Sequence, residues 1–490
     1  MTLFRSDIDN RATPHAPASA PLGEKAGGHI QFGVFFQGVN FSTVWSAPES
    51  GSQTEFESFR RIIQTAERGL FTAFFLGEGL RLREHLGNLH HLDVAERPDA
   101  FTQLAALAAI TSNIGLVATQ NVTYNDPVDL AHRLQSLDLI SGGRAAWNLV
   151  TTDNAWTGEN FRRGGYLDHA DRYVHGEDVI AIARKVWDAV ADGSVARDRR
   201  AASWGPTPQP FHHDTRYYSV DGHGILPRSA QQHPVLFQAG DSPEGRDFGA
   251  KNAEVIFSAH GRFAAAKAFA DDIRARTAAA GRPADDLKIF PGQEFIVADT
   301  EAEVRDKVRW VREHQVTPAT AIAFIEQLWG TDLSAYDPDG PLPATDPVQL
   351  ETGETRGAGF RAAKARETAA TWRSLSEEKG FSIRELVIHL SSGRSFTGTA
   401  ESIADELIPF AADHVVDGFN VTPWLVPSGL DDIVNKLVPA LQERGIYWTE
   451  YPGDTLRENL GLRAPLTRRP GAAEESRVAN ATVASRISAK

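Results

Sequence analysis

The sequence contains no cysteine among its 490 residues. This absence excludes disulfide bonds, a thiolate nucleophile and any zinc or iron–sulfur site built from cysteine ligands. Long apolar runs are also lacking, and no segment approaches the roughly 18–20 consecutive apolar residues that a membrane-spanning helix needs. The first 28 residues are polar and rich in Pro, Ala and Gly, whereas a signal peptide has a basic stretch followed by an apolar one. We therefore expect a cytoplasmic protein that does not enter a membrane.

Basic residues are fewer than acidic residues in this sequence. The chain has 50 basic and 64 acidic residues, which gives a formal net charge of -14. Proteins that bind nucleic acid gain affinity when basic groups displace counterions from the phosphates, so this balance argues against a nucleic-acid partner. Hydrophobic residues make up 41% of the chain and are sufficient for a large core.

Short apolar runs alternate with amphipathic stretches along most of the chain. An apolar run of four to eight residues predicts a buried strand, and apolar residues three or four apart predict a helix. The predicted strands lie at residues 29–36, 71–76, 114–118, 146–150, 235–239, 253–258, 287–297 and 418–421. The predicted helices lie at residues 56–68, 101–111, 127–140, 172–190, 243–251, 263–280, 301–313 and 430–444.

This order predicts an α/β protein with the (β/α)8 TIM-barrel fold and insertions. A doubly wound open sheet is the alternative, and the absence of a Gly-x-Gly-x-x-Gly sequence after the first strand argues against it. Residues 29–465 would form the barrel domain, between flexible tails at residues 1–28 and 466–490. Residues from about 318 to 395 interrupt the alternation. They include a Pro- and Gly-rich stretch, as expected of a long loop that acts as a lid.

Polar residues follow the predicted strands at the end where a TIM barrel carries its active site. They are mostly amides and hydroxyls: Glu78, Thr119, Asn121, Asn148, Thr151, Thr152, Gln293 and Asn420. Paired carboxylates with glycosidase spacing, a Ser-His-Asp triad and a cluster of metal ligands are all missing from these positions. Such a set suits a bound cofactor that performs the chemistry itself.

An anion site is predicted where the strand at residues 235–239 runs into the next helix. Ser242 or Asp241 would cap that helix and Pro243 would stand in its first turn, so that free backbone N–H groups face a phosphate. Simple capping without a ligand explains the same residues. His169 and Tyr173 are four apart and would share one helix face, either as hydrogen-bond donors to a cofactor or as a surface pair.

Two further histidines are candidates for acid–base catalysis. His260 follows the sixth predicted strand and His314 lies near the end of a predicted helix. Histidine titrates near neutral pH and therefore serves as a general acid or base, although it serves equally as an ordinary surface residue.

Several long motifs carry a resemblance to a known family. They lie at residues 74–80, 104–111, 114–119, 137–152, 234–240, 417–420, 437–445 and 454–462. Over about residues 30 to 465 the chain resembles the bacterial-luciferase-like flavin monooxygenases, in the branch of the nitrilotriacetate and dibenzothiophene-sulfone monooxygenases.

The resemblance implies a barrel that binds reduced FMN, supplied by a separate NAD(P)H:flavin reductase, and no metal. It assigns flavin contacts to Glu78, Thr119, His169, Tyr173 and Ser242. Glu78 departs from the branch, which usually has Asp there, and the preceding Gly77 replaces a usual Ala. Asn148 is placed near the flavin by its position at a strand tip rather than by the resemblance. Relatives form dimers or tetramers, which implies a homo-oligomer.

The predicted activity is oxygenation of a small organic substrate with O2, accompanied by cleavage of a C–S, C–N or C–halogen bond. We favour an aromatic or heterocyclic substrate because Phe35, Phe36, Phe41 and Trp45 lie near the first strand. An aminopolycarboxylate is the alternative, which Arg81, Arg83, His85, His90 and His91 would bind. Deazaflavin-dependent hydride transfer and flavin binding without catalysis are the rival functions.

Overall fold

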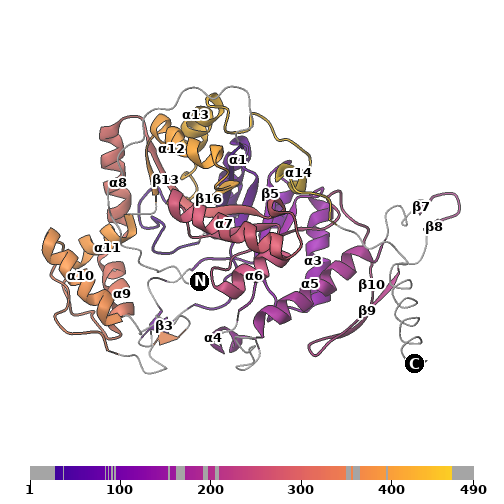
Figure 1. Ribbon diagram of the computed structural model, residues 1–490, viewed down its shortest axis with the longest axis horizontal. Helices are drawn as coiled ribbons and strands as arrows, with labels where there is room; N and C mark the ends of the chain where they lie inside the picture. Colours follow the sequence, from indigo (N-terminus) through magenta and orange to yellow (C-terminus); the bar gives the residue numbers. More distant parts are fainter. Residues whose placement is uncertain are drawn as a thin grey trace.

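The computed structural model describes residues 28–465, apart from residues 37, 83, 86–87, 90–91, 93–94, 153–154, 162–170, 191–196, 205–208, 349–354, 357–364 and 393–394. Within these residues, parallel strands form a closed barrel surrounded by helices (Figure 1).

The barrel consists of eight parallel strands in the described part of the chain. They are β1 (Gln31–Phe36), β2 (Ala73–Leu76), β5 (Gly115–Asn121), β6 (Ala145–Val150), β11 (Val235–Gln238), β12 (Val255–Ser258), β13 (Lys288–Ala298) and β16 (Gly418–Val421). The strands pair in the order β12-β11-β6-β5-β2-β1-β16-β13. Pairing of Val255 with Lys288 joins β12 to β13 and closes the ring. All eight predicted strands are present, and the predicted TIM barrel is confirmed.

Both faces of these strands are buried, which explains why they are mostly apolar rather than alternating. Residues of one parity point into the barrel, where Phe35, Phe75, Val117, Ala146 and Phe237 belong to one apolar cluster. Their neighbours of opposite parity, such as Trp147, pack outward against the helices. This alternation assigns each residue at a strand tip to the interior or to the outer layer.

The helices begin where the sequence supplies caps. Asp126 accepts a hydrogen bond from Val128 N at 2.9 Å and Pro127 stands in the first turn of its helix. Thr300 and Glu303 form a reciprocal capping box. The outer helices are α1 (Phe56–Arg68), α2 (Ala100–Ala108), α3 (Pro127–Ile140), α5 (Arg172–Asp188), α6 (Pro243–Asn252), α7 (Phe263–Ala279), α8 (Glu301–Gln315), α12 (Ala400–Ala412) and α13 (Val438–Glu443).

The last predicted helix, residues 430–444, differs in detail. A π-helical turn occupies Ile433–Leu437, and α13 begins only at Val438. Pro439 has no N–H to donate to the helical ladder, so the hydrogen-bond register changes just before it.

The chain between α8 and β15 forms a helical body of its own, at the lower left of Figure 1. Its helices α9 (Pro318–Trp329), α10 (Ala365–Lys379) and α11 (Ile383–Ser392) enclose a separate apolar cluster around Trp329 and Trp372. Strand β14 (Thr355–Arg356) pairs with β3 (Glu84–His85) in the loop after β2. Because that loop leaves the carboxyl end of β2, the insertion lies on the side of the barrel where the strand tips are.

The same segment is joined to the barrel by a ninth strand. Strand β15 (Ser395–Thr399) pairs in parallel with the second half of β13, from Glu294 to Ala298. The remaining short elements are β4 (Asn88–Leu89), α4 (Ala155–Gly158), β7 (Arg197–Asp198), β8 (Ser203–Trp204), the hairpin β9 (Pro210–Asp214) and β10 (Ser219–His223), η1 (Ala284–Asp286) and α14 (Leu456–Asn459).

The turn between α3 and β6 rests on a buried carboxyl group. Gly142 and Gly143 have φ angles of 73° and 90°, which favour glycine. Asp138 accepts hydrogen bonds from Ala145 N at 2.9 Å, from Gln231 Nε2 at 2.6 Å and from the Ser229 hydroxyl. Burial nevertheless raises the pKa of Asp138 to about 6, against the opposing effect of these hydrogen bonds.

Replacing Asp138 by Asn is expected to flatten the pH dependence of stability. The carboxyl of Asp138 binds its proton more tightly in the folded protein than in the unfolded chain. The folded protein therefore loses stability as the pH rises from about 4 to beyond 6. Since one pKa unit corresponds to roughly 1.4 kcal/mol, the stability difference between D138N and wild type should change by on the order of 2 kcal/mol over this window. Urea unfolding at pH 4.5, 6 and 7.5 measures it. If the free energy of unfolding changed with pH in the same way in D138N and wild type, the role given to Asp138 would be contradicted.

Candidate functional site

The interior of the barrel, below the strand tips, is lined by phenylalanine side chains. Phe35 and Phe75 meet edge to face with centroids 5.0 Å apart, and Phe237 lies 6.2 Å from Phe75. Phe257 contacts both Phe35 and Phe75, at 6.3 and 6.5 Å. These rings form an apolar floor for whatever binds above them. Of the other aromatic residues near β1, Phe36 points outward against Phe59, and Trp45 is 53% exposed.

Thr119 and Asn148 lie directly above this floor. The two residues are paired in register on β5 and β6, and Asn148 Nδ2 donates to Thr119 Oγ1 at 3.0 Å. Both side chains are buried, yet Asn148 Oδ1 has no hydrogen-bond partner in the described part of the chain. Asn420 Oδ1, on β16, likewise has no hydrogen-bond partner among the described residues. Buried acceptors normally have a partner, so these two oxygens are available to accept hydrogen bonds from a bound molecule.

The residues of the predicted anion site lie at the start of α6. Ser242 Oγ accepts from Gly245 N at 3.1 Å and so caps the helix, and Pro243 occupies the first turn. The Tyr173 hydroxyl lies over Gly245, since a Cβ added there would lie 2.8 Å from it. The Arg172 guanidinium stacks on the Tyr173 ring at 4.7 Å. A hydroxyl donor, a nearby guanidinium and a helix N-terminus together suit a phosphate.

Glu78 is the titratable group at the tip of β2. The pKa of its carboxyl is raised to about 8, mainly by burial and in smaller part by the Asp99 carboxylate. A backbone hydrogen bond from Asn121 and the Arg133 guanidinium act in the opposite direction. At neutral pH the carboxyl is therefore mostly protonated, and it can donate a hydrogen bond as well as accept one.

Arg97 also reaches the barrel opening, although its sequence context did not single it out. Its Cζ lies 5.6 Å from the centre of the Phe35 ring, and Nη1 lies 3.4 Å from the carbonyl oxygen of Glu78. A Cβ added at Gly77 would lie only 2.7 Å from Arg97 Cζ. The nearby loop residue Arg81, which was a candidate, is instead paired with Glu159 at 2.8 Å.

The two candidate acid–base histidines lie at different places. His260 Nε2 is 3.0 Å from Asp241 Oδ1, and its ring stacks on Phe269 at 5.0 Å. Because Asp241 adjoins Ser242, His260 lies beside the predicted anion site. His314, on α8, bonds through Nδ1 to the carbonyl oxygen of Trp310 at 2.7 Å and stacks on that ring. No contact of His314 with the other candidate residues is seen among the described residues.

The structure thus brings the candidates together in two groups. Thr119 and Asn148 form one group above the floor, and Tyr173, Ser242 and His260 surround the start of α6. His169 lies outside the described residues, as do Arg83, His90 and His91. Thr152 has a structural role, since its hydroxyl accepts from Asn121 and its carbonyl oxygen accepts from Thr123 Oγ1 at 2.7 Å.

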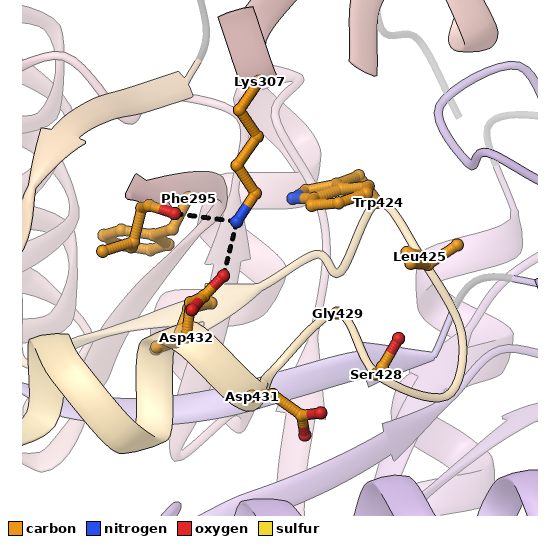
Figure 2. A pocket seen from close by; sticks show the side chains of 10 residues that line it. Phe295, Lys307, Trp424, Leu425, Ser428, Gly429, Asp431 and Asp432 are labelled. Atoms are coloured by element: carbon orange, nitrogen blue, oxygen red, sulfur yellow. Dashed lines mark hydrogen bonds and ion pairs between the residues drawn. The ribbon is translucent and has the colours of Figure 1, made fainter. Parts of the chain in front are cut away.

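A cavity of about 230 Å³ lies elsewhere, between β13, α8 and residues 424–433 (Figure 2). Lys307 reaches into it but already donates to Val297 O at 2.8 Å and pairs with Asp432, with the Trp424 ring at 5.7 Å. This cavity shares no lining residue with either group of candidates, and we do not assign the site to it.

Metal ligands were not expected, and the described residues contain no group of three or more His, Asp or Glu that could hold a metal ion.

Over the same residues, every helix is too short or too polar to cross a membrane.

Known proteins resemble this chain along most of its length. The family model of luciferase-like monooxygenases matches residues 30–415. Nitrilotriacetate monooxygenase component A of Aminobacter aminovorans is 37% identical over 456 residues, which cover 89% of this chain and 97% of the relative. Dibenzothiophene-sulfone monooxygenase of Rhodococcus erythropolis is 32% identical over 419 residues, which cover 83% and 90%.

Among solved structures, that of DmoA from Hyphomicrobium sulfonivorans aligns with a TM-score of 0.73 at 26% sequence identity. The alignment covers 88% of this chain and 92% of that chain. The barrel and its insertion are therefore compared over nearly their full length.

Proposed function

Because the chain belongs to the luciferase-like monooxygenase family, we propose that it is the oxygenating component of a two-component system that uses reduced FMN and O2. Its substrate would be a small organic molecule, with an aromatic or heterocyclic body, in which a C–S, C–N or C–halogen bond is cleaved. A separate NAD(P)H:flavin reductase would supply the reduced FMN. The working form would be a homo-oligomer, a dimer or a tetramer.

The observation that carries this proposal is the anion site at the tip of β11. Tyr173 and the capped N-terminus of α6 meet there and provide donors for the phosphate of FMN. The unpartnered Oδ1 of Asn148 lies on the neighbouring strand β6 and faces the barrel opening, where it would accept from a flavin ring N–H. The residues present therefore fit FMN.

Reduced FMN would supply the two electrons that oxygen activation requires, so no side chain has to act as a nucleophile. The work of the chain is to bind, to orient and to exclude water. Tyr173, Ser242 and His169 would hold the phosphate end, and Thr119, Asn148 and Glu78 would surround the ring. His260 would exchange protons at the rim through Asp241, and His314 is the second candidate for acid–base catalysis.

The insertion would act as a lid over this opening. Its strand β14 pairs with the loop after β2, and its apolar cluster includes Leu92 from that loop and packs against Phe41 from the loop after β1. A cover on the side of the strand tips would keep bulk water away from the flavin during the reaction.

The direct test is oxygen consumption by the purified protein with FMN and a flavin reductase. We expect O2 uptake to rise with substrate and one labelled oxygen atom from O2 to enter the product. Product formed without O2 would indicate deazaflavin-type hydride transfer instead. Tight FMN binding with no product from any substrate would indicate a flavin-binding protein without catalysis.

Replacing Tyr173 by Phe is expected to weaken FMN binding by about tenfold, because one hydrogen bond to a charged group contributes roughly 1.5 kcal/mol or more. Fluorescence titration of FMN measures the change. Tyr336→Phe is the matched control, since Tyr336 is 38% exposed on the insertion. Equal affinities of Y173F and wild type would remove Tyr173 from the proposed site.

An aminopolycarboxylate is the second candidate substrate class. It is favoured by the 37% identity to a nitrilotriacetate monooxygenase and by the presence of Arg97 at the barrel opening. The phenylalanine floor supports the aromatic class instead.

A further inference from the structure

We propose that Asn420 is a specificity-determining residue that accepts a hydrogen bond from a neutral N–H or O–H group of the substrate, on the wall of the barrel opposite Asn148. The proposal rests on the function proposed above and adds a hydrogen-bond donor to its aromatic or heterocyclic substrate. It assigns a ligand to the second of the two buried amide oxygens that have no partner among the described residues.

The side chain of Asn420 points into the barrel from β16. Its neighbours Phe419 and Val421 pack outward in the main apolar cluster, so Asn420 between them has the opposite parity. Its Oδ1 lies over Gly33 of β1, since a Cβ added at Gly33 would lie 3.1 Å from this oxygen. Asn420 is only 5% exposed, and a buried acceptor without a partner is costly. A donor supplied by a ligand would remove this cost.

Asn420 and Asn148 are level with each other on opposite walls. Three strands separate β6 from β16 in either direction around the closed ring. Asn148 pairs with Phe237 of β11, and Phe237 pairs with Val255 of β12. Val255 pairs with Lys288 of β13, whose register partner on β16 is the fourth residue before Asn420. Because the level rises by one residue per strand in a barrel with a shear of eight, these four steps bring Asn420 level with Asn148.

Two phenylalanine rings separate the amides of Asn148 and Asn420. Phe75 comes from β2 and Phe257 from β12, the strands midway between β6 and β16 on the two sides of the ring. The rings of Phe75 and Phe257 meet with centroids 6.5 Å apart. The two amides therefore lie on either side of the phenylalanine floor, and one small group of a ligand cannot bond to both.

The residues proposed to hold FMN belong to the wall of Asn148. Glu78, Thr119 and Ser242 follow or end β2, β5 and β11, whereas β16 and its neighbours β1 and β13 carry none of them. The insertion proposed as a lid joins the barrel through β15, which pairs with β13 beside β16. The wall of Asn420 thus lies next to the lid and away from the flavin contacts, where a substrate would bind.

The residues beside Asn420 suit an aromatic body. Its register partners on both neighbouring strands are glycines, Gly33 and Gly292. The Phe257 ring fills the space at Gly292, since a Cβ added there would lie 2.5 Å from Phe257 Cζ. Phe257 is only partly buried, so a ligand can reach this level of the barrel. An aromatic substrate would contact the Phe257 ring while its donor bonds to Asn420.

A neutral donor suits this wall better than a cation. Glu294, two residues after Gly292 on β13, is already paired with Arg312 at 2.6 Å. An ammonium group buried beside phenylalanine rings would need a carboxylate of its own, whereas a neutral N–H or O–H needs only an acceptor. The amide oxygen of Asn420 is such an acceptor.

Three substitutions separate the acceptor from the shape of the wall. Asn420→Leu removes the acceptor at similar volume, and Asn420→Asp keeps an oxygen acceptor. Gly33→Ala keeps Asn420 but crowds its Oδ1, which has to shift by a few tenths of an ångström. Asn435→Leu is the matched control, since Asn435 is exposed and lies 3.3 Å from Arg68 Nη2.

The experiment is calorimetric titration of the FMN-loaded protein with indole and 1-methylindole, and with phenol and anisole. In each pair a methyl group replaces the hydrogen of the N–H or O–H donor. We expect the ratio of the two affinities, donor-bearing over methylated, to be about twofold to tenfold higher in wild type than in N420L for at least one pair, the range for one neutral hydrogen bond. The ratio should also fall in G33A and should persist in N420D and N435L. The FMN affinity of all variants should stay within about twofold of wild type.

Equal ratios in wild type and N420L for both pairs would overturn the proposal, as would no binding of any of the four probes to the FMN-loaded protein. A loss of FMN affinity in N420L would instead assign the amide to the flavin. If N420L does not fold, an unchanged ratio in G33A has the same force as an unchanged ratio in N420L. The proposed function fails separately, if wild type does not bind FMN or consumes no O2 with any substrate.

Discussion

Replacing Glu294 by Ala is expected to lower the free energy of unfolding by about 3–5 kcal/mol, the usual result of leaving a buried charge without its partner. Glu294 Oε2 pairs with Arg312 Nη2 at 2.6 Å, and the two side chains are only 11% and 6% exposed. Gln315 Nε2 donates to the other carboxylate oxygen, Oε1, at 2.7 Å, and Ser395 Oγ donates to Oε2 at 2.5 Å.

The expected loss is large because the network of Glu294 and its partners joins three elements, β13, α8 and β15. Glu294 lies where β13 ends its pairing with β16 and begins its pairing with β15, and α8 supplies Arg312 and Gln315. Removing the carboxylate leaves a buried guanidinium and also loosens the attachment of β15, through which the insertion is joined to the barrel.

Unfolding in guanidinium chloride at pH 7 measures the change in the free energy of unfolding, taken from the first transition. The double variant E294M/R312M should lose less than E294A, since it leaves no unpaired charge. Asp306→Ala is the exposed counterpart, because Asp306 and Arg309 are 75% and 67% exposed, and it should cost less than about 1 kcal/mol. Similar losses in E294A and D306A would refute the assignment of a buried network.

The second large effect is expected at the opposite end of the barrel. Replacing Leu456 by Ala should cost about 2–5 kcal/mol, the range for truncating a fully buried leucine. Leu456 and Leu460 are 0% and 1% exposed and belong to the interior cluster of the barrel. Leu456 Cδ1 is the atom nearest to a Cβ added at Gly115, and Leu456 N donates to Gly143 O at 3.1 Å. Segment α14 therefore closes the end of the barrel at which β5 and β6 begin.

The same substitution should leave FMN affinity within about twofold of wild type below the unfolding temperature, because the proposed site lies at the other end of the strands. Leu456→Met keeps the volume and should cost less than about 1.5 kcal/mol. Thermal unfolding and FMN titration of both variants provide the measurements. A large loss of FMN affinity in folded L456A would show that the two ends of the barrel are coupled.

Local sequence was sufficient for the eight barrel strands and for most of the helices around them, whereas helices α9 to α12 and strand β15 were not predicted. Strands buried on both faces are short apolar runs, and helices that cover them carry apolar residues at helical spacing, so both patterns are readable without a structure. The cap at Ser242 was readable as well, since capping depends on residues within one turn. The long motifs and the strand-tip amides then identified the family.

Tertiary structure alone decided which polar residues meet. The hydrogen bond between Asn148 and Thr119 joins residues 29 positions apart, and Tyr173 reaches Gly245 from another helix. Arg97 was overlooked because its place depends on two glycines about 20 residues earlier, whose lack of side chains creates the space that it fills. A raised pKa such as that of Glu78 likewise depends on desolvation by neighbours that are distant in the chain. Periodicity and capping report contacts within a few residues, whereas burial and long-range pairing exist only once the barrel has closed.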